Sequence, residues 1–306
     1  MVTVSFPSAG WIRDVGAIEG IEPLVWHPDS PLPERSVQVV IAPYMGAAGC
    51  IGSVSRLPEV QLVQLLTAGY DGIFERVPEP IAIANAAGVH DVSTAELTLA
   101  LILAAQRGIP EFVRAQAQGA WRQLGFLPSL ADRQVVVIGY GGVGAAIVRR
   151  LLPFQPTIAA VASSARAGDE LVEQVHGLAD LPHLLPTAEV VVLAVPLTAA
   201  TRGLVDDAFL SALPDNALVV NIARGPVVSS AAILRHTGRL RFALDVTDPE
   251  PLPPEHPLWR APGVLITPHV GGPSTAFRPR AVALLREQLR RIGAGREPLN
   301  IVRAGR

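Results

Sequence analysis

The chain has 306 residues, of which 49% are hydrophobic and 17% are charged, so it can bury a large core and two domains are the natural expectation. The formal charge is −2 and there is no basic run, which argues against a nucleic-acid partner. The first residues lack the charged and apolar regions of a signal peptide, and no apolar stretch approaches the roughly 20 residues that span a bilayer. We therefore expect a cytoplasmic protein with no membrane partner.

Every basic residue is an arginine, since the sequence contains no lysine. This excludes mechanisms that need a lysine amine, such as Schiff-base catalysis, the Walker A loop and the Tyr-x-x-x-Lys pair of short-chain dehydrogenases. The single cysteine, Cys50, allows neither an internal disulfide nor a multi-cysteine zinc site. No metal site is expected.

Short β-rich runs alternate with helical stretches in the first third of the chain. The runs 2–6, 37–42 and 81–84 read as strands, and the run 60–66 reads as a strand or a helix end. This alternation predicts βαβ units and a parallel sheet. Residues 94–107 form a helix that is apolar on nearly all sides, which is typical of a buried helix or of one that packs against a second copy. We expect this helix to join two domains.

A second and cleaner α/β series starts at Gln134. Its predicted strands alternate with helices, the first of which covers 145–152, and six such strands make a complete doubly wound sheet. An arginine-rich helix near 276–291 should then return to the first domain, which would make that domain discontinuous. The predicted strands are 135–139, 157–162, 189–196, 217–222, 241–246 and 264–269.

The glycine-rich segment 139–144 fits the pattern G-x-G-x-x-G, directly after an apolar strand and at the start of a helix. That context gives a tight turn, a close backbone approach to a pyrophosphate, and amides with a helix dipole that face the anion. The alternative is a purely structural turn. We expect the loop to bind a dinucleotide through Gly139, Gly141, Val143 and Gly144.

The end of the next predicted strand carries the signal for cofactor choice. A NAD-specific site has an acid about 20 residues after the loop, but here the strand ends in Ser163, Ser164 and Arg166, with no acid before Asp169. Hydroxyls and an arginine fork can bind a 2′-phosphate that a carboxylate would repel. We therefore favour NADP over NAD. The alternative is that Ser164 caps a following helix and Arg166 lies in solvent.

Three further segments follow the ends of successive strands, where ligands bind in an open α/β sheet, and they contain Arg224, Glu250 and His269. An arginine fork can bind a carboxylate and polarise the adjacent keto oxygen. A cationic histidine can protonate the developing alkoxide as hydride arrives, and a carboxylate favours that cation and fixes the ring. Taken singly, these residues can equally be a surface ion pair or an ordinary hydrogen-bonded histidine.

From about Leu62 to Ile301 the chain resembles the D-isomer-specific 2-hydroxyacid dehydrogenase family, in particular its glyoxylate and hydroxypyruvate reductases. The expected acid after the second strand of the cofactor domain is missing, which is the main departure from the family pattern. The resemblance rests on segments 68–71, 85–88, 94–96, 139–144, 195–198, 201–202, 221–225, 245–251, 257–259 and 267–269.

The resemblance implies a role for each candidate residue. Arg224 would bind the substrate, His269 would be the acid/base, and Glu250 would be its carboxylate partner. Backbone amides near Gly69 and Tyr70 would hold the substrate carboxylate. The remaining cofactor contacts would come from Val195, Pro196, Thr201, Ile222, Ala223, Asp245 and Gly271.

The fold implied is α/β, with two Rossmann-like or flavodoxin-like domains, each a doubly wound parallel sheet, and a cleft between them. Residues 1–100 with 276–306 would form the substrate domain, and residues 101–275 the dinucleotide domain. The activity implied is reduction of a small 2-keto acid, such as glyoxylate or hydroxypyruvate, to the D-2-hydroxy acid with NADP or NAD. The alternative is a cofactor-sensing binding protein, because corepressors similar to this family share its fold.

Two further expectations concern assembly and the cleft. The apolar helix 94–107 and Trp121, in a Gly-x-Trp segment, favour a homodimer. His90 should approach the cleft, and Tyr44 and Met45 are candidates to close over a substrate side chain, with packing in the core as the alternative.

Overall fold

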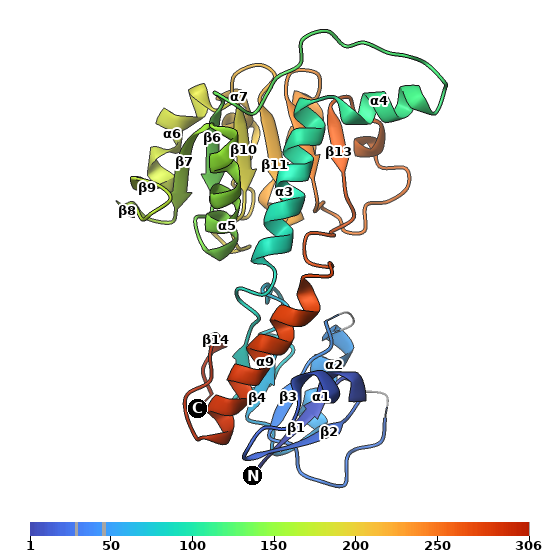
Figure 1. Cartoon of the computed structure of the whole chain (residues 1–306), viewed down its shortest axis with the longest axis vertical. Coiled ribbons are helices and arrows are strands. Elements are labelled where there is room, and N and C mark those ends of the chain that lie inside the picture. The colour runs from blue at the N-terminus through green and yellow to red at the C-terminus, as the bar shows by residue number, and fades with distance from the viewer. Residues whose placement is uncertain (28–29, 45–46, 306) are drawn as a thin grey trace. The chain divides into compact units, whose positions relative to one another are not determined.

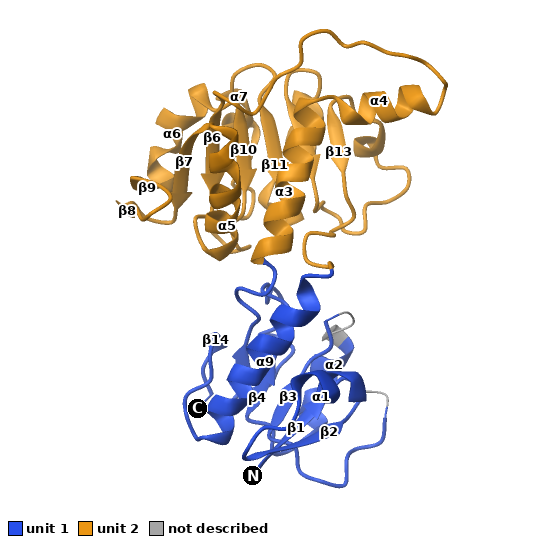
Figure 2. Cartoon of the chain, viewed as in Figure 1, with its two compact units in different colours: residues 1–90, 275–306 blue, residues 91–274 orange. Residues whose placement is uncertain are grey.

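The computed structural model describes residues 1–27, 30–44 and 47–305. The chain divides into two compact units: unit 1 comprises residues 1–90 and 275–306, and unit 2 comprises residues 91–274 (Figure 2). Both units are layered α/β structures with parallel sheets, which confirms the predicted fold class. The first boundary falls before α3 (Asp91–Gln106), whereas residue 100 lies inside that helix.

Unit 1 is built on a six-stranded sheet in the order β14-β5-β4-β3-β1-β2. Its first five strands are parallel and follow the order 2-1-3-4-5 of flavodoxin-like sheets, and β14 pairs with β5 antiparallel. The run 60–66 therefore contains a strand. The strands are β1 (Val2–Phe6), β2 (Ile21–Val25), β3 (Val39–Ile41), β4 (Leu62–Gln64), β5 (Ala82–Ala84) and β14 (Ile301–Arg303).

Helices cover both faces of this sheet. α1 packs beside α9, and they bury Trp11, Leu285 and Leu289 on one face (Figure 1). The other face carries a second core that includes Ile51 of α2 and Val54. The helices are α1 (Ala9–Val15), α2 (Ala47–Ser53), the short 3₁₀ helix Val54–Arg56 and α9 (Phe277–Gly293).

Unit 2 is built on an eight-stranded sheet in the order β13-β12-β11-β10-β6-β7-β9-β8. All pairs are parallel except β8 with β9. The six strands β9-β7-β6-β10-β11-β12 follow the order 3-2-1-4-5-6 of a Rossmann sheet, and β13 extends it beyond β12. The six predicted strands are all present, and β8 and β9 were not predicted. The strands are β6 (Gln134–Ile138), β7 (Thr157–Ala162), β8 (Arg166–Ala167), β9 (Gln174–Gly177), β10 (Val190–Leu193), β11 (Leu218–Asn221), β12 (Arg241–Leu244) and β13 (Val264–Ile266).

The helices of unit 2 also cover both faces of its sheet. On one face α3 packs against α5 and against β11 and β12, which explains why this helix is apolar on nearly all sides (Figure 1). Short helices cover the other face. Besides α3, the α-helices are α4 (Ile109–Gln116), α5 (Gly142–Leu151), α6 (Leu181–Leu184), α7 (Asp207–Ser211) and α8 (Ser230–His236), and the 3₁₀ helices are Leu152–Phe154, Leu178–Asp180, Leu185–Thr187, Gly225–Val227 and Pro257–Arg260.

The strand order of unit 2 reverses between β6 and β10. Gly139 follows β6 and Ala194 follows β10, so both loops leave the sheet at the same edge. Ligands of open α/β sheets bind outside the carboxyl ends of the strands at such a switch point. In the part of the chain that the structure describes, no helix has the length and apolarity to cross a membrane.

Candidate active site

The three glycines of the loop 139–144 have three different structural roles. Gly139 has φ +107°, a conformation that disfavours other residues, and a Cβ there would lie 2.5 Å from the carbonyl of Ala194. A Cβ at Gly144 would collide with the carbonyl oxygen of Gly139, so this glycine lets α5 pack onto the turn. A Cβ at Gly141, in contrast, would meet no described atom within 4 Å. The open side of the loop is therefore at Gly141.

The first turn of α5 faces that open side. Gly141 is the N-cap and has no side chain to cap the helix, so the first turn of α5 presents its amides at the loop, where they favour an anion. The side of the loop at Gly142 is closed by α3, because a Cβ there would collide with the carboxylate of Asp91. The backbone cradle fits a dinucleotide pyrophosphate, as the glycine pattern predicts, and Val143 lies half-buried inside it.

The predicted ribose end of this site lies after β7. Ser163 and Ser164 are exposed, and Ser164 is followed by β8 rather than by a helix, so it does not cap one. Arg166 lies at the start of β8, and its Nη2 donates a hydrogen bond to the backbone oxygen of Tyr140 (2.9 Å). The arginine is thus held against the glycine loop. The next acid, Asp169, accepts a hydrogen bond from the Tyr140 hydroxyl.

Arg224 is held in a loop after β11 by the side chain of Asn221. Oδ1 of Asn221 accepts from the amide of Ala223 (3.0 Å), and its Nδ2 donates to the carbonyl of Arg224 (3.0 Å). A Cβ at Gly225 would collide with the carbonyl of Thr247, so the arginine loop packs directly on the loop after β12. The arginine side chain itself is half-buried.

Asp245, at the end of β12, shapes the neighbouring histidine loop. It is 3% exposed, and its carboxylate accepts from the Thr267 hydroxyl (2.6 Å) and from the amides of Val270 and Gly271 (2.9 Å each). Its backbone oxygen accepts from the amide of His269 (2.8 Å). The structure therefore gives Asp245 a loop-organising role; its contact with the cofactor stays a prediction.

His269 and Glu250 form the pair that the sequence predicts. The Nδ1 of His269 lies 2.6 Å from Oε1 of Glu250, so the ring donates its Nδ1 proton to the carboxylate and Nε2 remains for proton transfer. The histidine has φ +52°, a left-handed conformation that is rare outside glycine and recurs at functional sites. Both side chains are open to solvent, at 47% and 41% exposed.

Two hydroxyls hold the loop that carries Glu250. Thr247 donates to the carbonyl of Pro249 (2.9 Å), and Ser230 of α8 donates to the carbonyl of Asp248 (2.9 Å). Because β11, β12 and β13 are parallel neighbours, the loops after them leave the same edge of the sheet. Unit 2 thus brings the predicted catalytic residues to one edge.

The remaining predicted cofactor residues lie at that same edge. Thr201 is buried, and its hydroxyl donates to the carbonyl of Pro196 (2.5 Å) and accepts from the amide of Thr198 (2.8 Å), so it shapes its own loop. Gly271 accepts from the hydroxyl of Thr94 in α3 (3.3 Å). Two of the rest follow β10 and two follow β11: Val195, Pro196, Ile222 and Ala223.

The predicted carboxylate-binding segment belongs to unit 1. Gly69 follows β4, and its carbonyl accepts from the hydroxyl of Thr67 (2.8 Å). The side-chain Nδ2 of Asn85 donates to the carbonyl of Ala68 (2.7 Å), so the turn is tied to the end of β5. Tyr70 is 36% exposed. Its ring stacks on Phe74, with 5.4 Å between the ring centroids.

His90 is a buried residue of unit 1. It is 7% exposed, and its Nε2 lies 2.9 Å from the carbonyl of Leu66. Its ring stacks on Tyr44 and on Phe277, at 5.2 and 5.3 Å between centroids. The packing alternative thus accounts for what is seen of His90 and Tyr44, and Met45 lies outside the described residues.

Asn221, Thr267 and Thr94 support the site without having been assigned a role in it. Each lies in a segment that carries the family resemblance, but the amide of Asn221 and the hydroxyl of Thr94 bind backbone and the hydroxyl of Thr267 binds a carboxylate, and such bonds leave no pattern distinguishable from ordinary polar residues. The one available signal was the position of Asn221 and Thr267 at the ends of predicted strands; Thr94, in a helix, had none.

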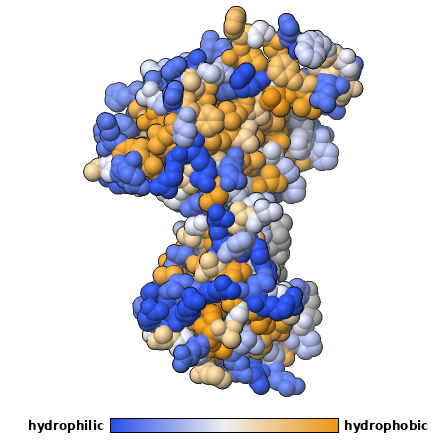
Figure 3. All heavy atoms as spheres, viewed as in Figure 1, coloured by the Kyte–Doolittle hydropathy of each residue, from blue (hydrophilic) through white to orange (hydrophobic). Residues whose placement is uncertain are grey.

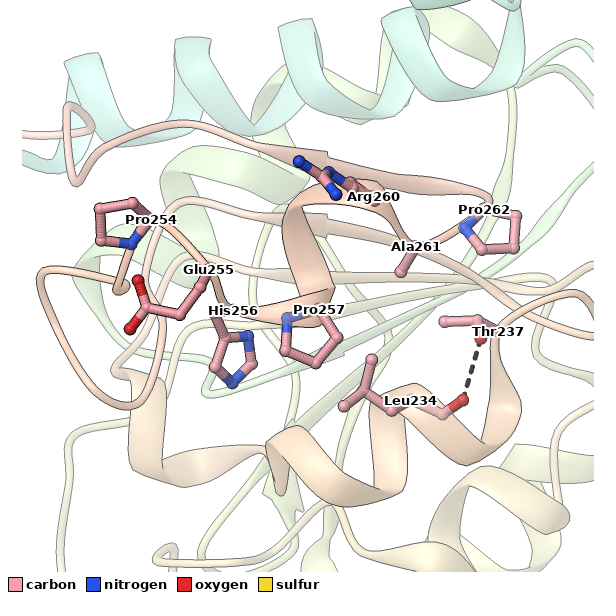
Figure 4. A pocket seen from close by; sticks show the side chains of 9 residues that line it. All are labelled: Leu234, Thr237, Pro254, Glu255, His256, Pro257, Arg260, Ala261 and Pro262. Atoms are coloured by element: carbon pink, nitrogen blue, oxygen red, sulfur yellow. Dashed lines mark hydrogen bonds between the residues drawn. The ribbon is translucent and has the colours of Figure 1, made fainter.

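A hollow of about 510 Å³ lies elsewhere in unit 2, between the end of α8 and a proline-rich segment (Figure 4). None of the predicted site residues lines it, and His256 at its wall caps a 3₁₀ helix by accepting from the amide of Leu258 (3.3 Å). Among the residues described, no group of three or more His, Cys, Asp or Glu side chains is placed to hold a metal ion. The lining is Leu234, Thr237, Pro254, Glu255, His256, Pro257, Arg260, Ala261 and Pro262.

Known proteins are similar to this chain in sequence and in fold. Residues 99–271 match the family described as D-isomer specific 2-hydroxyacid dehydrogenase, NAD binding domain. A glyoxylate reductase of Thermofilum pendens is 31% identical over 80% of this chain and 75% of its own. A human glyoxylate reductase/hydroxypyruvate reductase is 28% identical over 88% and 87%.

Solved structures agree with these relatives. A D-isomer specific 2-hydroxyacid dehydrogenase from Xanthobacter autotrophicus Py2, crystallised with NADPH and MES, is 30% identical. It superimposes with a TM-score of 0.80 over 98% of this chain and 97% of that one. The chain is therefore a member of the D-isomer specific 2-hydroxyacid dehydrogenase family, a family of NAD(P)-dependent oxidoreductases.

Proposed function

We propose that this protein is a reductase that prefers NADPH and converts a small 2-keto acid into the D-2-hydroxy acid. The observation that carries the proposal is the His269–Glu250 pair, 2.6 Å from Nδ1 to Oε1, at the sheet edge that also carries Arg224. Bound NADPH would supply the hydride. The residues of the chain would supply binding, polarisation and the proton.

Arg224 is the proposed substrate-binding residue. Its planar guanidinium can bind a carboxylate with two parallel hydrogen bonds and polarise the adjacent keto oxygen, which a lysine could not do with the same geometry. Asn221 fixes the backbone from which the arginine projects. The loop is therefore organised before substrate arrives.

His269 is the proposed acid/base. Glu250 accepts the Nδ1 proton, so the ring is oriented and Nε2 donates its proton to the developing alkoxide. Oxidation of the hydroxy acid would run the same proton transfer backwards. The exposed position of both side chains leaves the histidine open to substrate from solution.

Cofactor preference is proposed from the end of β7. Ser163, Ser164 and Arg166 stand where a NAD-specific site has a carboxylate, and Arg166 is held against the glycine loop. The NADPH complex of the Xanthobacter relative supports the choice. We expect Arg166→Ala to weaken NADPH binding about tenfold and to leave NADH nearly unchanged.

The two units would divide the work. Unit 2 would bind the dinucleotide and supply Arg224 and His269, and the backbone amides near Gly69 and Tyr70 of unit 1 would bind the substrate carboxylate. Glyoxylate and hydroxypyruvate are the first candidates, because relatives that share about 30% of their residues with this chain are named for them. We further propose a cytoplasmic homodimer, which the exposed aromatic residues Trp121 and Phe126 of unit 2 support.

The test is a panel of 2-keto acids assayed with NADPH and with NADH. The proposal predicts turnover of at least one small 2-keto acid, with kcat/KM higher for NADPH, and a D-configured product. Tight cofactor binding without turnover of any member of the panel would instead favour a cofactor-sensing binding protein.

A further inference from the structure

Tyr140, between the first two glycines of the loop, is 6% exposed and is contacted at both ends by the segment that follows β7. At its backbone end, Arg166 donates to the carbonyl oxygen (2.9 Å), and the guanidinium carbon lies 5.9 Å from the ring centroid. At its hydroxyl end, the oxygen lies 2.9 and 3.0 Å from the two carboxylate oxygens of Asp169. Arg166 and Asp169 are close in sequence but bind opposite ends of the same tyrosine.

The hairpin of β8 and β9 fixes both residues. Within its turn, the amide of Gly168 donates to the carbonyl of Glu173 (3.1 Å), and the amide of Asp169 donates to the carbonyl of Val172 (2.9 Å). A Cβ at Gly168 would collide with the carbonyl of Val172, so the turn is tight. A rigid hairpin of this kind fixes the backbone positions of Arg166 and Asp169 relative to Tyr140.

The charge states follow from the contacts. The amide of Leu171 donates to the carboxylate of Asp169, and this bond, followed by the bond from Tyr140, lowers the pKa of Asp169, which therefore stays anionic. Burial, then the hydrogen bond to Asp169, raises the pKa of Tyr140 to about 12, so its hydroxyl keeps the proton it donates. Two further charged side chains that act on Tyr140, Arg149 and Glu170, are paired with each other at 2.9 Å.

We propose that Tyr140 and Asp169 are positioning residues for cofactor preference: the Tyr140 hydroxyl holds the Asp169 carboxylate away from Arg166, and the guanidinium is left to bind a 2′-phosphate. The inference rests on the proposed preference for NADPH. No ion pair joins Arg166 to a carboxylate within the described residues. An unrestrained carboxylate would neutralise the guanidinium, repel the phosphate, and resemble the acid that binds the ribose hydroxyls in NAD-specific sites.

The experiment measures the dissociation constants of NADPH and NADH for the full chain by titration calorimetry. Tyr140→Phe keeps the ring but removes the hydroxyl that holds Asp169, whose carboxylate then keeps only the bonds from the turn amides of Leu171 and Val172. NADPH should therefore bind about five- to tenfold more weakly, while NADH changes by less than about twofold. Adding Asp169→Asn to Tyr140→Phe removes the charge and should return NADPH binding to within about twofold of the wild type. Asp169→Asn alone should bind NADPH at least as tightly as the wild type.

Equal losses for both cofactors in Tyr140→Phe, or no recovery in the double variant, would overturn the inference and leave Tyr140 a purely structural residue. Weaker NADPH binding by Asp169→Asn alone would overturn it as well, even if Tyr140→Phe does not fold. Arg166→Ala distinguishes a failure of the role given to Tyr140 from a failure of the proposed NADPH preference. If Arg166→Ala loses NADPH selectively and Tyr140→Phe does not, only the role of the tyrosine fails; if neither variant loses NADPH selectively, the proposed NADPH preference fails too.

Discussion

Individual side chains organise this site through backbone bonds more than through side-chain pairs. Asn221 brackets the Arg224 loop, and Asp245 accepts from two amides and one hydroxyl of the His269 loop. Sequence reasoning predicted Arg224, Glu250 and His269 because each lies after a buried strand. It did not predict which of their neighbours hold the loops, because that depends on geometry within about 3 Å.

The arginine can be tested by a change that keeps its charge. Arg224→Lys loses the planar fork, so KM for the keto acid should rise about tenfold or more, while the dissociation constant of NADPH stays within about twofold. Steady-state kinetics and calorimetry measure the two quantities. Arg260→Lys, an exposed arginine of a 3₁₀ helix, is the matched control and should change neither. An unchanged KM in Arg224→Lys would remove the arginine from the substrate site.

Among the elements, long and strongly apolar segments were predictable and short ones were not. The six predicted strands of unit 2 and the helix α3 have apolar runs, whereas β8 has two residues, both exposed, and owes its pairing to β9. The same hairpin overturns the alternative in which Ser164 caps a following helix. The polar sequence around Arg166 did not indicate that this segment would pair with β9.

The glycine loop offers a matched pair of substitutions at the level of the element. Gly144→Ala should destabilise unit 2, because its Cβ would collide with the Gly139 carbonyl, and thermal unfolding should occur at lower temperature. Gly141→Ala faces open space, so the protein should fold normally yet bind both dinucleotides at least about tenfold more weakly, since the methyl group occupies the path of the pyrophosphate. Normal dinucleotide binding by Gly141→Ala would contradict the placement of the pyrophosphate.

At the scale of the whole molecule, unit 2 exposes large apolar side chains to solvent. Between α4 and β6 the chain runs as a long arm without helix or strand, and on it Trp121 is 94% and Phe126 108% exposed (Figure 1). Ile109 and Val113 of α4 are also exposed. Apolar atoms reach the surface of unit 2 on the face drawn in Figure 3. Large exposed apolar groups of this kind mark interaction surfaces.

These residues support the proposed homodimer. Light scattering at micromolar concentration should give twice the mass of one chain, and Trp121→Asp with Phe126→Asp should give the mass of one chain, because charges would be buried in the interface. Trp259→Asp, at a 48% exposed tryptophan outside the arm, is the control and should stay dimeric. A wild-type protein that is monomeric under these conditions would refute the assembly. The helix 94–107 packs on α5 and the sheet over much of its surface, as the buried alternative predicts, and its contact with a second copy stays a prediction.

The pH dependence of keto-acid reduction tests the central claim, that His269 donates the proton under the control of Glu250, most directly. Because reduction needs a proton donor and oxidation a proton acceptor, the account predicts that kcat/KM for reduction with NADPH falls as pH rises and that the rate of hydroxy-acid oxidation rises over the same range. His269→Ala should lower the reduction rate by about 10² to 10⁴-fold and abolish this pH dependence. Near-normal turnover by His269→Ala would contradict the account. So would the same dependence of the reduction rate on pH in His269→Ala and in the wild type.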